Sequence, residues 1–369
     1  MPVRLFECHQ YHALVRGGMM GRWQMRRMYL LTRWVAASAL LGAVGLSLYF
    51  ISARFNSARD ALPTAFPDPT TIAAKEPITP LPLTLSLAPD KVKLGARLFG
   101  DPKLSGDGSV SCAHCHNLAT GGVDRLPRSR GIGGREGNIN APTVFNSGFD
   151  FRQFRDGRAA TLEDQIDGPL QNPVEMGNSW PKALAMLEAD ASYRSEFAAL
   201  YPDGIQIANV KDAIATFERS LVTPNARFDR FLRGDLTALN EQEQAGYRLF
   251  KRIGCTSCHQ GMGIGGNLYQ KLGIMEDYFS VRGHIAKVDG GRFNLTGREE
   301  DRYFFKVPSL RNVAVTPPYL HDGSARTLED VVGIMARFQL GKKLDATETS
   351  ELVAFLKTLT GEYQGRPLE

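Results

Sequence analysis

Two stretches of the same form, Cys112-Ala-His-Cys115-His116 and Cys255-Thr-Ser-Cys258-His259, decide the fold of this 369-residue chain. In this pattern two thiols close thioether bonds to a porphyrin and the adjacent histidine ligates its iron, which is how c-type haem is attached. The alternatives are a redox dithiol and half of a zinc site, but a zinc site needs further soft ligands and none are left over. The spacing therefore predicts two covalent haems, with His116 and His259 as iron ligands.

Two other segments recur along the chain at one common offset. Pro142-Thr-Val-Phe-Asn146 matches Pro308-Ser-Leu-Arg-Asn312, which lies 166 residues later. At the same offset of 166, residues 156–164 (DGRAATLED) match residues 322–330 (DGSARTLED). Matches that share an offset indicate a tandem duplication. We expect two haem domains, a first copy over residues 89–224 and a second copy over residues 225–369.

Amphipathic patterns predict a mainly α fold. Strand-like alternation is scarce, whereas apolar residues recur at helical spacing in four stretches. Acidic or amide residues at capping spacing mark two of the starts. The four expected helices cover Asp90 to Phe99 with Gly100 as a cap, Asn209 to Leu221, a stretch that begins at Asn240, and one that begins at Asp345 and ends before Gly361.

Positive charge is concentrated at the N-terminus. Residues 1–56 hold seven arginines and one acid, so the remainder carries about −1 although the whole chain carries +5. A nucleic-acid-binding protein would carry its basic patch on the folded domains. That class of function is therefore excluded.

Six of these arginines precede an uncharged apolar run, Trp34 to Ile51, which is just long enough to span a bilayer as a helix. Basic flanking residues keep the N-terminal side in the cytoplasm. A cleaved signal peptide, followed by a soluble periplasmic protein, is the alternative. We expect a cytoplasmic N-terminus and inner-membrane anchor over residues 1–56, a proline-rich linker over residues 57–88, and a periplasmic catalytic part.

The sixth iron position decides what each haem does. A histidine–methionine pair fills the iron and raises its potential, whereas an open position suits peroxide. In the second copy Met335 is the candidate for the sixth iron ligand. The alternative is that Met335 is an ordinary methionine of the hydrophobic core. The corresponding position of the first copy is Pro169, which cannot ligate iron. The residues nearby that could line the open side of the first haem are Gln165 and Glu175, and Met176 is a possible stray ligand.

Several segments resemble the bacterial di-haem cytochrome c peroxidase family, which also includes the MauG-type enzymes. The resemblance runs from about residue 89 to residue 361. It rests on residues 140–146 (NAPTVFN), 156–159 (DGRA), 168–177 (GPLQNPVEMG), 305–312 (FKVPSLRN), 318–323 (PYLHDG) and 352–361 (LVAFLKTLTG).

The resemblance implies that hydrogen peroxide is reduced at the first haem. The second haem takes electrons from a c-type cytochrome, a cupredoxin or a quinol. Met335 becomes the distal ligand of the second haem, while Glu175 acts as acid and base and Gln165 holds the peroxide by a hydrogen bond. The resemblance also implies one Ca²⁺ held by Asn140 and the backbone oxygens of Thr316 and Pro318, and a homodimer is a further expectation.

Two positions depart from the family pattern. A histidine that blocks the first haem is often found eight residues before Asn140, but Ile132 stands there. Since isoleucine cannot ligate iron, we expect the oxidised protein to react with peroxide without prior reduction. The family often has a tryptophan between the haems, and here the residue is Arg155.

Two other functions compete with the peroxidase reading. A non-catalytic di-haem electron-transfer cytochrome would need a strong second ligand on the first haem, for which Met176 is the nearby candidate. A MauG-type oxidase of a partner protein carries tyrosine at the position of Met335, so the methionine argues against it.

Overall fold

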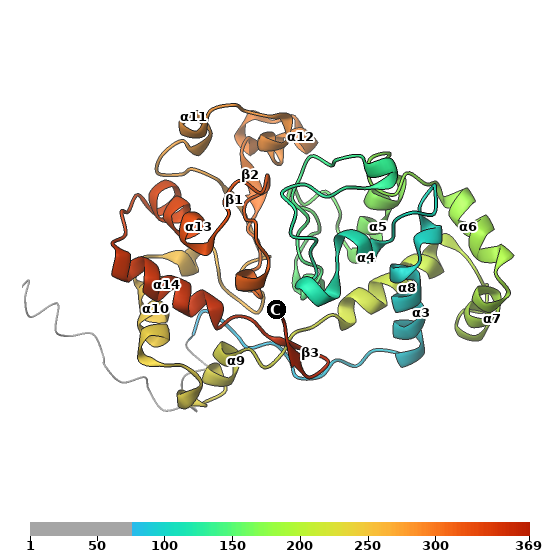
Figure 1. The fold of residues 1–369 in the computed structure, drawn as a ribbon, viewed down its shortest axis with the longest axis horizontal. Helices are drawn as coiled ribbons and strands as arrows, with labels where there is room; N and C mark the ends of the chain where they lie inside the picture. The colour runs from blue at the N-terminus through green and yellow to red at the C-terminus, as the bar shows by residue number, and fades with distance from the viewer. Residues whose placement is uncertain (1–75) are drawn as a thin grey trace, which may run out of the picture. The chain divides into compact units, whose positions relative to one another are not determined.

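The structure, a computed structural model, describes residues 76–369, which lie within one compact unit that spans residues 67–369 (Figure 1). The expected segment 1–56, with its apolar run at 34–51, and most of the expected linker lie outside the described residues. Among residues 76–369 no helix is both long and apolar enough to cross a bilayer.

The described part of the chain is mainly helical, as predicted. Its α-helices are α3 (Pro89–Gly100), α4 (Cys112–Cys115), α5 (Leu162–Gln171), α6 (Trp180–Ala189), α7 (Ala191–Leu200), α8 (Ile207–Ser220), α9 (Arg227–Leu232), α10 (Glu241–Arg252), α11 (Tyr278–Arg282), α12 (Phe293–Thr296), α13 (Leu328–Ile334) and α14 (Ala346–Lys357). A π-helical turn, Met335–Gln339, continues α13. Strand β1 (Tyr269–Lys271) pairs antiparallel with β2 (Phe304–Lys306), and β3 (Glu362–Tyr363) with β4 (Arg366–Pro367).

The four expected helices are confirmed as α3, α8, α10 and α14. Asn240 and Glu243 form the predicted capping box of α10, and Asp345 and Glu348 form that of α14. One detail is wrong: Gly100 belongs to α3 itself, and the helix ends on Asp101, whose backbone is extended. The terminal glycine is therefore not needed for a left-handed turn at this end.

Each copy is built around one crossing of two helices, α3 with α8 and α10 with α14 (Figure 1). At Gly95 of α3 an added Cβ would lie 1.9 Å from the carbonyl oxygen of Ala213. At Gly246 of α10 it would lie 2.0 Å from the carbonyl oxygen of Glu351. The two glycines therefore occupy equivalent places, and each lets a helix backbone approach its partner more closely than alanine would permit.

The tandem duplication is visible in the local structure. Gln153 bridges Ala159 in the first copy, and Tyr319 bridges Ala325 at the same relative positions in the second. Thr161 caps α5 and Thr327 caps α13, each accepting a hydrogen bond from the backbone N–H three residues on. The repeated segments thus fold in the same way as far as the first turn of a helix.

The repeated asparagines meet at one threonine between the copies. Asn146 and Asn312 are fully buried and left-handed, with φ of 63° and 62°. Their amides donate to the hydroxyl of Thr223 over 2.9 Å and 3.0 Å. Left-handed asparagine is tolerated because its short amide can bond to nearby groups. This buried network joins the two copies close to residue 224.

Candidate functional site

Both motif histidines are held by one ring nitrogen and leave the other for a ligand. Nδ1 of His116 lies 3.3 Å from the carbonyl oxygen of Gly122, and Nδ1 of His259 lies 3.1 Å from that of Ile264. Burial lowers the pKa of His116 and brings the pKa of His259 to about 4. Neutral imidazoles whose Nδ1–H is bonded to a carbonyl are suited to bind iron through Nε2.

The motif cysteines do not have the properties of a redox dithiol. The four thiols form no disulfide. Burial is the main cause that raises the pKa of Cys112 to about 12, of Cys115 to about 11 and of Cys255 to about 12. Reactive dithiols have a lowered pKa instead. Within residues 76–369 no cysteine joins a cluster of metal-ligating side chains, so zinc is not supported either.

The donor set of the first copy fits a haem. The thiols of Cys112 and Cys115 form no disulfide, and they stand beside the neutral imidazole of His116, whose Nε2 is left for a ligand. Cys112, Cys115 and His116 are therefore the residues that would hold it. Elsewhere in the described part of this copy, Oε2 of Glu218 and Nε of Arg155 are buried without a hydrogen-bond partner.

Glu175 lies on the loop after α5 and close enough to the first motif for its charge to raise the pKa of Cys115. Its Oε1 accepts a 2.6 Å hydrogen bond from the side-chain amide of Asn172. Burial raises the pKa of Glu175, although the Asn172 bond and the charge of Arg158 oppose this shift. The structure thus brings Glu175 to the haem motif of its own copy.

The other predicted residues of the first copy surround this loop. Gln165 is half-buried on α5, and its side-chain amide makes no hydrogen bond to any residue in 76–369. Met176 is 5% exposed and belongs to the core cluster, against which Ile132 packs. The backbone N–H of Ile132 donates to the carbonyl oxygen of Glu175 over 2.8 Å. This bond fixes the Ile132 loop against the loop that carries the carboxylate.

Met335 lies where α13 changes to the π-helical turn. π-helical turns within helices are frequent at functional sites. Met335 packs against a small aromatic cluster that contains Tyr278 and Phe338. At the end of the same turn, Leu340 lies 3.9 Å from the place where a Cβ on Gly254, the residue before Cys255, would be. The turn that begins at Met335 therefore ends beside the second motif.

The side chain of the expected calcium site does not present a free oxygen to an ion. One terminal nitrogen of Arg155, Nη2, donates to the side-chain oxygen of Asn140 over 3.0 Å and to its backbone oxygen over 3.3 Å. Burial lowers the pKa of Arg155 to about 10, so the guanidinium remains charged at neutral pH. A Ca²⁺ that shares these oxygens with a cation is opposed by charge repulsion. The backbone oxygens of Thr316 and Pro318 accept no hydrogen bond from residues 76–369, but the site that they would form with Asn140 does not fit calcium while Arg155 occupies it.

A charged cluster next to this corner could in principle hold a metal. Asp289, His321 and Asp322 lie close enough together to share one ion. Each carboxylate, however, pairs with Arg282, and Nε2 of His321 lies 2.6 Å from Asp289. The backbone oxygen of His321 accepts from Asn140 N–H over 2.9 Å. The cluster orders the corner between the two copies.

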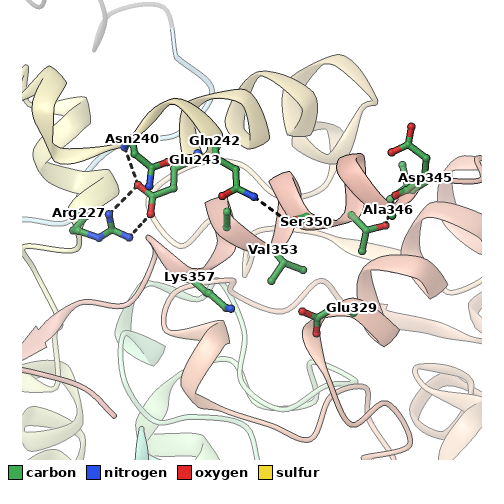
Figure 2. Close-up of a pocket in the computed structure, with 13 residues that line it drawn as sticks. Arg227, Asn240, Gln242, Glu243, Glu329, Asp345, Ala346, Ser350, Val353 and Lys357 are labelled. Atoms are coloured by element: carbon green, nitrogen blue, oxygen red, sulfur yellow. Dashed lines mark hydrogen bonds and ion pairs between the residues drawn. The ribbon is translucent and has the colours of Figure 1, made fainter.

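A surface pocket between α10 and α14 contains none of the predicted site residues (Figure 2). Gln242 donates to Ser350 across it over 2.9 Å, and Arg227 pairs with Glu243 at one end. The first contact holds α10 against α14, the second joins α9 to α10, and neither carries redox chemistry. The pocket is therefore separate from the haem motifs.

Comparisons with known proteins agree with the motifs. The model of the family described as di-haem cytochrome c peroxidase matches residues 89–237. Cytochrome c peroxidase Ccp of Escherichia coli (strain K12) is 48% identical over 78% of this chain, which spans 62% of that protein's length. Cytochrome c551 peroxidase of Nitrosomonas europaea is 44% identical, with 82% of this chain and 89% of that protein covered.

The fold resembles solved structures of the same group. The crystal structure of a MauG-like protein associated with microbial copper homeostasis superposes with a TM-score of 0.66 and 30% identity, covering 82% of this chain and 95% of that one.

Proposed function

The chain belongs to the di-haem cytochrome c peroxidase family, and on this premise we propose that it reduces hydrogen peroxide to water. Peroxide reacts at the haem of the first copy, residues 89–224. Electrons enter at the haem of the second copy, residues 225–369. The overall reaction joins one peroxide, two protons and two electrons to give two water molecules.

One observation carries this proposal: the copies begin alike and then diverge where each would complete its iron site. After the caps Thr161 and Thr327, α13 leads into the turn that starts at Met335. In α5 the corresponding residue is Pro169, and the chain continues into the loop with Glu175. A thioether in one copy and a proton-transferring carboxyl group in the other separate electron storage from peroxide chemistry.

The residues of the first copy supply positioning and proton transfer. Haem c, when bound, supplies the iron at which peroxide binds and receives electrons. Glu175 removes the proton from one peroxide oxygen and returns it to the other, which leaves as water. Burial raises the pKa of Glu175 above that of an exposed carboxyl, and Asn172 fixes one carboxyl oxygen. The unpaired amide of Gln165 holds the outer oxygen.

The competing functions have less support. A purely electron-carrying cytochrome needs a second strong ligand on the first haem, but Met176 is buried in the core cluster of its copy. A MauG-type oxidase of a partner protein needs an oxygen ligand at the place of Met335. The methionine favours a peroxidase that draws electrons from an external donor.

Location and partners extend the proposal beyond the described residues. We infer a periplasmic enzyme tethered by the apolar run at residues 34–51, with a cleaved signal peptide as the alternative. A c-type cytochrome, a cupredoxin or a membrane quinol then lies within reach as donor. A homodimer remains a proposal, which the mass of the purified protein tests.

Steady-state turnover of peroxide with each class of reduced donor tests the proposed function. The peroxidase reading requires peroxide-dependent oxidation of at least one of these donors. If oxidised protein binds neither peroxide nor cyanide while both haems can be reduced, the electron-carrier reading is correct instead.

A further inference from the structure

The corner between the copies already contains a cation of its own. Asn140 is 6% exposed, and its backbone N–H donates across the junction to His321. Its side-chain nitrogen donates to the carbonyl oxygen of Leu126 over 2.9 Å. Because a carbonyl can only accept, this bond fixes the orientation of the amide and points its oxygen away from Leu126. That oxygen faces Arg155 instead.

The backbone that carries Arg155 is fixed to the second copy. The backbone N–H of Lys306, in β2, donates to the carbonyl oxygen of Arg155 over 2.6 Å. Arg292 donates to the next carbonyl, that of Asp156, over 3.2 Å. From this anchored backbone the side chain of Arg155 reaches Asn140, where Nη2 contacts both oxygens.

The positive charge of Arg155 is not neutralised by a direct ion pair. Within the described ranges no carboxylate lies within 4.0 Å of its guanidinium nitrogens. Asp322 acts on it through space, but Asp322 is itself paired with Arg282 over 2.9 Å. Asp289 is paired with the same arginine. The corner therefore lacks the spare negative charge that a second cation beside Arg155 would need.

We propose that the Arg155 guanidinium is the resident cation of this corner and takes the place of Ca²⁺ in this chain. Its Nη2 binds the side-chain oxygen of Asn140 that the ion would otherwise use, together with the backbone oxygen of the same residue, and the junction between the copies is then independent of calcium. An arginine suits the role because it stays charged at any physiological pH and binds in a fixed geometry. The proposal concerns cation binding and does not depend on peroxide turnover.

Calcium binding to the full-length holoprotein tests the proposal directly. After treatment with EGTA and buffer exchange, the parent protein should contain much less than one calcium per chain by elemental analysis. Its thermal midpoint should not respond to millimolar CaCl₂. The variant Arg155→Gln removes the charge and exposes the oxygens of Asn140, so it should bind about one calcium per chain. Its midpoint should rise by roughly 5 °C when calcium exceeds its Kd about a hundredfold.

Two variants serve as controls. Arg155→Lys keeps a cation and should stay unresponsive to calcium, and Arg152→Gln removes a nearby exposed arginine and should behave as the parent does. One tightly held calcium per chain in the parent would overturn the proposal, and this measurement needs no variant to fold. A folded Arg155→Gln protein that ignores calcium would also overturn it, because Arg155 would then not be occupying a calcium site.

Discussion

The side-chain amide of Asn172 donates a 2.6 Å hydrogen bond to Oε1 of Glu175, three residues further along the chain. The Asn172 side-chain oxygen accepts from the backbone N–H of Val174 over 3.1 Å, so the asparagine is fixed at both ends. It positions the carboxyl group that lies beside the first haem motif. Asn172 is thus a positioning residue for Glu175, and both can be tested separately.

Glu175→Gln keeps the shape of the side chain but removes its ability to exchange a proton. We expect kcat to fall by about 10²–10⁴-fold, which is the usual worth of general acid–base help. Haem content, by pyridine haemochrome assay, should stay at two per chain. Glu188→Gln, an exposed change on α6, is the matched control. Turnover within about twofold of the parent would remove Glu175 from the mechanism.

Asn172→Ala should alter the pH dependence of turnover more than its maximum. The Asn172 bond lowers the pKa of Glu175, so its loss raises that pKa further. Because the free enzyme needs an ionised Glu175 to accept the first proton, the acid limb of kcat/KM should move to higher pH. A pH–rate profile between pH 5 and 9 measures the shift. An unchanged acid limb, with both haems attached, would mean that the bond does not tune the base.

Met335→His should keep the second iron six-coordinate and lower its potential. The change replaces a thioether by an imidazole, and axial ligands set haem potentials over roughly 0.8 V. Spectroelectrochemical titration should show one of the two potentials falling and the other staying near its parent value. Met275→Leu, at an exposed methionine of the same copy, should leave both unchanged. If Met335→His also leaves both potentials unchanged, Met335 is only a core residue.

Glu218 of α8 occupies the place that Leu356 occupies in α14, since each follows the phenylalanine that packs on the crossing glycine. Both are 6% exposed. Burial raises the pKa of Glu218 to about 8 from an ordinary value of 4.5. The unfolded chain therefore releases this proton at lower pH than the folded protein does. The free energy of unfolding therefore falls progressively as pH rises from about 4.5 to about 8.

Glu218→Leu should accordingly stabilise the holoprotein at pH 8 by up to several kcal/mol, and the gain should shrink toward pH 4.5. Glu243→Gln is the contrasting control, because Glu243 is equally buried but paired with Arg227 and part of a capping box. Glu243→Gln should lower the free energy of unfolding of the holoprotein. Denaturant unfolding at several pH values measures both. A gain from Glu218→Leu that does not vary with pH would show that the carboxyl is already ionised in the fold.

Much of the helical framework could be predicted from the sequence, because capping residues and apolar spacing act locally. Asn240 and Asp345 marked their helices correctly. The starts of α5 and α13 were also readable, since Thr161 and Thr327 stand in the repeated segment three residues before an acid. Helix α6, whose N-cap side chain makes no capping hydrogen bond, was not predicted.

The contacts within the site were less accessible to sequence reasoning. Asn172 follows from local turn chemistry, because an asparagine before a proline commonly bonds to the residues just after it. The pairing of Arg155 with Asn140 has no such signal: the residues are 15 apart, in irregular segments that the second copy holds in place. The resemblance to the family suggested calcium at Asn140, and only the three-dimensional arrangement revealed the competing cation. Glu218 was missed because its equivalence to Leu356 depends on the two helix crossings.

The measurement that tests the central claim most directly is the stoichiometry of donor oxidation by peroxide. Fully oxidised protein, with no reducing pretreatment, is mixed with excess reduced donor and a limiting amount of hydrogen peroxide. We predict two one-electron equivalents oxidised per peroxide, without a lag, in the parent protein, and almost none on the same timescale in Glu175→Gln. If the parent consumes no peroxide, although both haems are attached and accept electrons from the donor, this chain is an electron carrier and not a peroxidase.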